Sequence, residues 1–264
     1  MEITVNGVSM AYRTAGRPGQ PVLVLIHGFP LDSAMWDAQL EALAQHCFVV
    51  APDLRGHGKS EAPPGPYSID RHADDVAALM DALGVREAVI GGLSMGGYVA
   101  LAFWRRHRGK VGGLALIDTR ANADTPEGRA ARDATIARVR ERGVGILAEE
   151  MAPRLLASEN QGETEVARTL RAMIERQPVE GMAAALLAMR DRPDASLSLT
   201  TVNVPAVVIV GEEDAITPVV VAQELARRLP DARLSIVPRA GHMAPMEAPE
   251  AVNAALLDLV RRTG

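Results

Sequence analysis

The serine at position 94 stands in the spacing Gly-x-Ser-x-Gly, between Gly92 and Gly96. The apolar run Ala88 to Ile90 precedes it, and a helix-like stretch from Tyr98 to Arg106 follows it. A strand, a sharp turn and a helix in this order place a serine hydroxyl at the apex of the turn. Glycine is needed on both sides because larger side chains would collide there. The spacing predicts a nucleophile, and the alternative is a glycine-rich connection whose serine only caps a helix.

Two other residues have the chemistry to activate this hydroxyl. A neutral imidazole can take the serine proton, and a carboxylate can fix the imidazole tautomer and stabilise its charged form. Asp214 follows the strand-like run Ala206 to Val210, and His242 follows Leu234 to Val237. The carboxyl ends of parallel strands meet at one edge of a sheet. The order Ser94, Asp214, His242 therefore predicts a catalytic triad assembled at that edge.

The negatively charged intermediate of such a reaction needs two fixed hydrogen-bond donors. The backbone N–H of Met95 follows the serine at a helix N-terminus, where an anion is stabilised. The second donor should come from the loop after the strand-like run Val22 to Ile26, and we assign it to the N–H of Phe29. Both are backbone groups, so they can act whatever side chains they carry.

Other acids and imidazoles compete for these roles. Asp118 also follows a strand-like run and is the alternative to Asp214 as the acid. We interpret His27 as a support for the loop that carries Phe29, and His57 lies within a glycine-rich turn. The remaining histidines are expected to be solvated at helix ends or faces: His46, His72 and His107. No close metal-ligand spacing is present, so neither a metal nor a cofactor is implied.

Strand-like and helix-like segments alternate through most of the chain, which predicts parallel βαβ units and an α/β class. Eight strand-like runs indicate a doubly wound, mostly parallel eight-stranded sheet. Residues 120–199 contain helical patterns and no clear strand, so they are expected to form an all-helical insertion between two strands. The predicted division is a core of residues 1–119 and 200–264 and a helical insertion of residues 120–199.

The composition limits the class of protein. The chain has 264 residues, 48% of them apolar, and a net charge of -5, which argues against nucleic acid as a partner. The single cysteine, Cys47, cannot form an internal disulfide and is expected to pack in the core. No signal peptide and no membrane span are recognisable. These features predict a soluble cytoplasmic protein with a small-molecule substrate, and they leave homo-oligomerisation open.

The ordered motifs give the chain a resemblance to the α/β-hydrolase family over essentially its whole length. The motifs are His27-Gly28-Phe29-Pro30, the segment from Asp53 to Ser60, Gly92 to Gly97, Gly211 to Asp214, and Gly241-His242. Within the family it is similar to cofactor-free carboxylesterases, 3-oxoadipate enol-lactonases and non-haem perhydrolases. The resemblance implies that Asp214 is the acid, because Gly211 and Pro218 match the acid loop of the family, and that His57 braces its loop. It also implies that the helical insertion is a cap over the pocket. Members with aspartate at the apex act on haloalkanes or epoxides, whereas Ser94 favours acyl transfer to water.

The resulting hypothesis is a serine hydrolase that cleaves a small carboxylic ester or lactone through an acyl-enzyme. The alternatives are a cofactor-free perhydrolase or haloperoxidase, a C–C bond hydrolase of the same fold, and a ligand receptor without catalysis. The predicted pocket is mostly apolar and is lined by Phe29, Met95, Ile216, Val219 and Met243. A substrate with a carboxylate would need an arginine, for which Arg120, Arg154 and Arg190 are the candidates.

Overall fold

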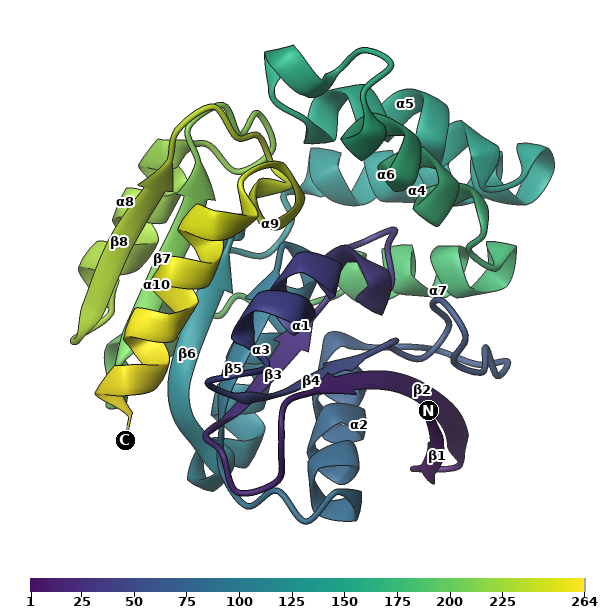
Figure 1. The fold of residues 1–264 in the computed structure, drawn as a ribbon. Helices are drawn as coiled ribbons and strands as arrows, with labels where there is room; N and C mark the ends of the chain where they lie inside the picture. The colour runs from purple at the N-terminus through teal and green to yellow at the C-terminus, as the bar shows by residue number, and fades with distance from the viewer. Residues whose placement is uncertain (264) are drawn as a thin grey trace.

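The computed structural model describes residues 1–263, which are built around one sheet of eight strands (Figure 1). The strand order is β1-β2-β4-β3-β5-β6-β7-β8. Strands β3 to β8 pair in parallel, whereas β1 and β2 are antiparallel to their neighbours. This arrangement confirms the predicted fold class. The strand bounds are Glu2–Val5 (β1), Val8–Ala15 (β2), Val22–Ile26 (β3), Phe48–Pro52 (β4), Ala88–Leu93 (β5), Val111–Ile117 (β6), Ala206–Gly211 (β7) and Ala232–Val237 (β8).

Helices cover both faces of the sheet, as expected for a doubly wound arrangement (Figure 1). One face packs against α1 and α10, with the short α9 beside them. The other face packs against α2, α3 and α8. The bounds of these helices are Asp37–Leu43 (α1), Ile69–Ala82 (α2), Met95–His107 (α3), Val219–Arg228 (α8), Ala244–Glu247 (α9) and Pro249–Arg262 (α10).

Local sequence signals account for where several helices begin. Ser68 precedes α2, and its hydroxyl accepts a hydrogen bond from the N–H of Arg71, as an N-cap does. The sequence indicates one helix from about residue 34 to residue 44, but the structure divides this segment into a 3₁₀ turn, Ser33–Trp36, followed by α1. The Asp32 carboxylate accepts from the N–H of Ala34 and so caps the 3₁₀ turn. The division of this helix was not visible in the apolar periodicity.

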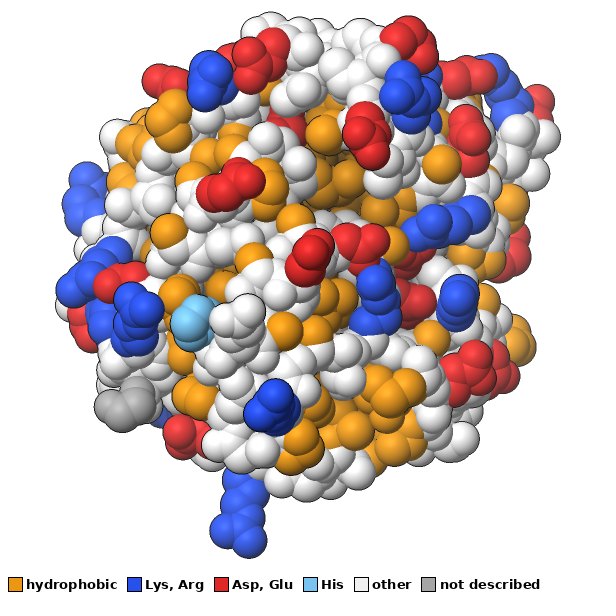
Figure 2. All heavy atoms as spheres, viewed as in Figure 1, with side chains coloured by type: hydrophobic (Ala, Val, Ile, Leu, Met, Phe, Trp, Pro, Cys, Tyr) orange, Lys and Arg blue, Asp and Glu red, His pale blue; other side chains and the backbone are white. Residues whose placement is uncertain are grey.

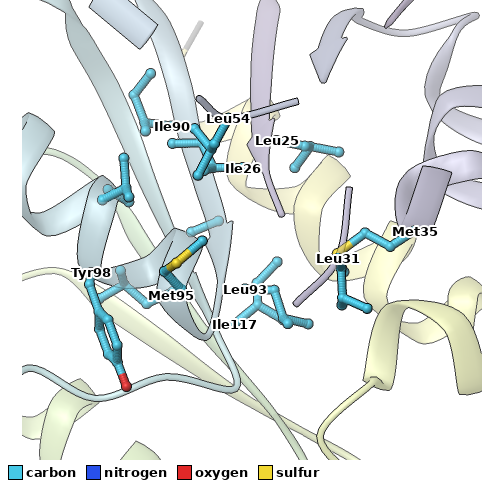
Figure 3. Close-up of a cluster of buried hydrophobic side chains, with 14 of the residues drawn as sticks. Leu25, Ile26, Leu31, Met35, Leu54, Ile90, Leu93, Met95, Tyr98 and Ile117 are labelled. Atoms are coloured by element: carbon cyan, nitrogen blue, oxygen red, sulfur yellow. The ribbon is translucent and has the colours of Figure 1, made fainter. Parts of the chain in front are cut away.

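The centre of the sheet is buried on both faces because helices cover it from two sides. Strand β5 is buried at all six positions, and β3 at its last four. Figure 3 shows side chains from β3, β5, β6 and the start of α3 gathered into one apolar cluster, among them Leu25, Ile90 and Met95. This rigid cluster holds the end of β5, where Ser94 follows.

Helices α4 to α7 lie between β6 and β7 in the chain and form a separate group above the sheet (Figure 1). We call this group the helical insertion. Arg176, which follows α6, makes two hydrogen bonds to the Asp32 carboxylate, of 2.8 and 2.7 Å, and so ties the insertion to the segment after β3. Gln177 strengthens the tie through Asp32 and the N–H of Gly58. The bounds are Pro126–Arg142 (α4), Gly145–Leu155 (α5), Glu165–Glu175 (α6) and Val179–Arg190 (α7).

Within residues 1–263, no helix combines the length and the apolar character needed to cross a bilayer.

Candidate active site

Ser94 occupies the sharp turn between β5 and α3 in a strained backbone conformation, with φ 53° and ψ -110°. The two flanking glycines are required by close contacts with backbone. A methyl group at Gly92 would lie 2.1 Å from the carbonyl oxygen of Gly96, and one at Gly96 would lie 2.2 Å from that of Ile26. Any larger residue would therefore force this turn apart. The geometry agrees with the reason that the sequence gives for glycine at both positions.

The loop after β3 runs directly beside this turn. A methyl group at Gly28 would lie 3.5 Å from Cβ of Ser94, so the backbone that leads to Phe29 borders the serine. The N–H of Phe29 donates no backbone hydrogen bond within residues 1–263. Met95 is the first residue of α3, where a helix offers its N–H no internal acceptor. Both predicted donors are therefore available to a ligand, and their role as an oxyanion hole stays a prediction.

The structure brings Asp214 and His242 together at the ends of β7 and β8. Nδ1 of His242 lies 2.8 Å from Oδ2 of Asp214, and both side chains are buried. Ser94 follows β5 at the same edge of the sheet. Its hydroxyl makes no hydrogen bond to His242 among the described residues. The contact between Ser94 and His242 therefore stays a prediction, supported by their position at the same edge of the sheet.

Asp214 is held in its ionised form by four donors. Oδ1 accepts from the N–H groups of Ile216 and Thr217, at 2.7 and 2.9 Å. Oδ2 accepts from the Thr217 hydroxyl at 2.6 Å and from His242. Burial by itself raises the pKa of Asp214. The hydrogen bond and charge of His242 and the two hydrogen bonds from Thr217 outweigh burial and lower this pKa to about 2.

Sequence reasoning missed this role of Thr217. The sequence indicates a helix over residues 218–229 with Thr217 as its cap, but α8 begins at Val219 and has Pro218 at its N-cap. The threonine hydroxyl turns back to the carboxylate instead. The missed signal was the spacing Asp-x-x-Thr, because an aspartate that accepts from backbone N–H groups two and three residues later forms a tight local turn.

His242 is placed by a close approach between two loops. A methyl group at Gly211 would lie 2.0 Å from the carbonyl oxygen of Gly241, so glycine lets the segment before His242 rest on the end of β7. Glu247 accepts from the N–H of Gly241 at 2.7 Å and from that of Ala157 at 2.7 Å. The loop is thereby fixed to both the sheet and the segment that follows α5 in the helical insertion.

Three buried imidazoles lie behind the site, and one of them corrects a prediction. His27 contacts the carbonyl oxygen of Gly28 through Nδ1 and accepts from the N–H of Leu54, so it supports the loop that carries Phe29. The ring centroids of His27 and His57 are 4.9 Å apart, and those of His57 and His72 are 6.2 Å apart. The expectation that His72 is solvated was wrong: it lies on the inner face of α2 and is fully buried.

This histidine cluster should make the fold sensitive to acid. Burial, followed by the positive potential of His27 and Arg55, lowers the pKa of His72 to about 3, and burial also lowers the pKa of His27 and His57. Each ring therefore takes up a proton less readily in the folded chain than in the unfolded chain, where it is protonated below about pH 6.5. Stability is therefore lost as the pH falls below that value, by up to about 1.4 kcal/mol per pH unit for each ring.

Replacing His72 with phenylalanine should flatten this dependence. The free energy of unfolding, measured by urea titration between pH 7 and 4.5, should lose up to about 1.4 kcal/mol of slope per pH unit relative to the wild type. The same change at the exposed His46 is the matched control and should leave the slope as it is. If the pH dependence of the free energy of unfolding were the same in His72→Phe as in the wild type, the His72 ring would bind its proton equally well in the folded and the unfolded chain.

A groove of about 450 Å³ opens between the helical insertion and the loop after β3. Its apolar lining includes Phe29 from the loop and Leu147, Met151 and Leu186 from the insertion. Charged side chains of the insertion also line it, namely Asp124, Arg132, Arg138, Glu150 and Arg154. Figure 2 shows apolar side chains in a hollow near the insertion, with acidic and basic side chains around it. Phe29 is thus the one predicted pocket residue that lines this groove.

The other predicted pocket residues lie elsewhere. Met95 and Met243 are fully buried, whereas Ile216 and Val219 are half-buried around the Asp214 loop. Their part in binding stays a prediction.

The three candidate arginines lie in different places. Arg190 binds Asp133 and Asp191 on the exterior of the insertion. Arg120 donates to the carbonyl oxygen of Ile216 at 2.6 Å. Arg154 is the member of the three that borders the groove.

Comparison with known proteins places the chain in a family. Residues 21–249 match the family described as alpha/beta hydrolase fold. A thermophilic esterase from Thermogutta terrifontis, solved with malate bound, is 42% identical with a TM-score of 0.95, and the match covers 100% of this chain and 99% of the esterase. The enol-lactonase from Burkholderia xenovorans LB400 is 32% identical with a TM-score of 0.92, over 99% and 100% of the two chains.

Sequence comparison gives the same grouping. The 3-oxoadipate enol-lactonase 2 of Acinetobacter baylyi is 29% identical over 265 residues, covering 98% of this chain and 96% of the lactonase. The chain belongs to the α/β-hydrolase family.

Proposed function

We propose that the protein is a serine hydrolase that cleaves a small carboxylic ester or lactone through an acyl-enzyme. The observation that carries the proposal is the buried Asp214–His242 pair, 2.8 Å apart, at the sheet edge where Ser94 stands on a strained turn. A histidine oriented by a carboxylate is the general base that a serine hydroxyl needs. The esterase and lactonase relatives support the same class of substrate.

In the first half-reaction, Oγ of Ser94 forms a bond to the acyl carbon, and His242 takes the hydroxyl proton. The C–O bond to the leaving alcohol then breaks, and His242 returns the proton to that oxygen. In the second half-reaction, water attacks the acyl carbon while His242 takes one of its protons. The bond to Ser94 then breaks, the acid leaves, and the serine recovers its proton.

The charge on the tetrahedral intermediate would be held by the N–H groups of Phe29 and Met95. The backbone beside Phe29 borders Ser94, and the N–H of Met95 stands at the positive end of α3. Two such donors act on charge that appears only as the intermediate forms, so they lower the barrier more than they strengthen substrate binding.

Residues 120–199 would act as the cap of the site, and the groove beneath them would hold the acyl or alcohol part of the substrate. The apolar lining by Phe29, Leu147, Met151 and Leu186 suits a short hydrocarbon group. A volume of about 450 Å³ is within the range of small-molecule sites. The guanidinium of Arg154 at the border would favour substrates with an anionic end.

A fluorophosphonate probe tests the proposal directly. The probe forms a stable bond with an activated serine, so intact-mass measurement should show one adduct per chain, and peptide mapping should place it on Ser94. Prior incubation with p-nitrophenyl butyrate should slow labelling, and protein unfolded in urea should not react. Turnover of the ester with no adduct, or with an adduct on another residue, would contradict the proposed nucleophile.

A further inference from the structure

Two buried carboxyl groups lie side by side at the ends of β6 and β7, and only one belongs to the proposed triad. Asp118 follows β6 with a left-handed backbone, φ 44°, and its N–H donates to the carbonyl oxygen of Ile209 at 2.8 Å. Its side chain is fully buried and accepts from the N–H of Gly211, whose carbonyl oxygen in turn accepts from the N–H of Asp214, so the two acids flank the same residue. Two ionised carboxylates buried this close together repel each other, which favours the uptake of a proton by one of them.

The hydrogen bonds decide which carboxyl carries it. Asp214 receives four donors, from Ile216, Thr217 and His242, which stabilise its negative charge. Asp118 receives a single one, from the N–H of Gly211 to Oδ1 at 2.8 Å. Its Oδ2 is buried and accepts no N–H or O–H within residues 1–263. An atom in this position is satisfied when it carries a proton and donates it.

We propose that Asp118 is a positioning residue that stays protonated in the active protein and donates its carboxylic proton to Asp214. The donated bond adds a fifth hydrogen bond to Asp214 and fixes the carboxylate that orients His242. This inference rests on the proposed function, because it assigns Asp118 to the same acid–histidine pair.

The electrostatic surroundings support this protonation. Burial raises the pKa of Asp118 well above its usual range, and the charges of Asp214 and, more weakly, Glu247 add to the rise. The hydrogen bond from Gly211 opposes it without reversing it. His242 contacts Asp214 directly. When His242 becomes positively charged in the proposed reaction, it would meet a carboxylate that Asp118 already holds in place.

Matched substitutions separate a neutral donor from an ionised acid. Asp118→Asn keeps the shape, accepts from Gly211 through its carbonyl oxygen and donates to Asp214 through its amide. Ester hydrolysis should therefore stay within about threefold of the wild type. Asp118→Leu keeps the size but removes both interactions, and kcat/KM should fall on the order of 10- to 100-fold. Equal losses in the asparagine and leucine variants would overturn the proposal.

Two readouts do not depend on turnover and keep the test valid if the leucine variant fails to fold. Infrared spectra at neutral pH should show the C=O band of a protonated carboxyl, present in Ser94→Ala and absent in Asp118→Asn. A band that survives in Asp118→Asn would overturn the assignment. Because Ser94→Ala abolishes the proposed chemistry but keeps this band, a failure of the proposed function can be told apart from a failure of this inference.

Stability provides the second readout. The folded chain keeps a proton on Asp118 that the unfolded chain releases near pH 4, so wild-type stability falls as the pH rises above that value. Asp118→Asn carries no such proton. The folded state of this variant should therefore gain stability relative to the wild type as the pH rises above about 4, by up to tenfold in the folding equilibrium constant per pH unit, until the folded wild type also releases the proton. A difference that stays constant with pH would contradict the protonated state.

Discussion

Replacing Ser94 with alanine should lower kcat for p-nitrophenyl butyrate by about 10⁶-fold, because the acyl-enzyme can no longer form. The loss should fall on kcat more than on KM, since the groove and the backbone donors remain. Initial rates at saturating ester measure the effect. The fold should be unchanged, because a methyl group occupies the place of the hydroxymethyl group without new contacts.

The control for this variant is Ser235→Ala, a serine on β8 away from the predicted site, which should keep full activity. Circular dichroism and the thermal midpoint should agree for both variants and the wild type. Turnover by Ser94→Ala at even a few per cent of the wild-type rate would show that another group is the nucleophile, and the acyl-enzyme route would then be wrong.

Replacing Asp214 with asparagine should lower kcat by about 10⁴-fold. The amide has nearly the same shape, but its NH₂ group donates to Nδ1 of His242, whereas the carboxylate accepts from Nδ1–H, so the imidazole is held in the wrong tautomer. The neighbouring Asp118→Asn is the matched control, because an identical chemical change one strand away should have a small effect. Steady-state kinetics of the two variants, measured side by side, decide which carboxyl orients the histidine.

The same substitution should change the dependence of stability on acid. Because the pKa of Asp214 is lowered to about 2 when folded, the ionised carboxylate stabilises the fold above about pH 4. That stabilisation is lost as the pH falls from about 4 toward 2, and Asp214→Asn lacks it throughout. In the kinetic comparison described above, full activity in both Asp214→Asn and Asp118→Asn would show that neither acid orients His242.

The sequence was sufficient for features governed by local geometry. Glycine at positions 92 and 96 pointed to a turn too tight for side chains, and the backbone contacts there have that character. Alternating apolar runs and helical periodicities identified the sheet, because a strand covered on both faces must be apolar throughout. Chain order then placed Asp214 and His242 at one edge, where they are in contact.

Features that depend on contacts between distant segments could not be read in this way. The burial of His72 comes from its packing against His57 and Tyr67, and a helix face alone does not reveal which partners cover it. The pairing of Arg176 with Asp32 spans 144 residues of sequence. Arginine on a helix is usually solvated, so nothing in the local pattern distinguishes this one from its neighbours.

The left-handed backbone at Ser94 has a consequence for how the molecule divides its free energy. A non-glycine residue in a sparsely populated conformation costs about 1–3 kcal/mol, and glycine at this position would avoid that cost. Selection for heat resistance alone would favour the residue that has no hydroxyl. In the proposed mechanism, serine at this position gives up part of the folding stability at one peptide unit in order to place its oxygen atom at the apex of the turn, and improvements in heat resistance must be found in other parts of the chain.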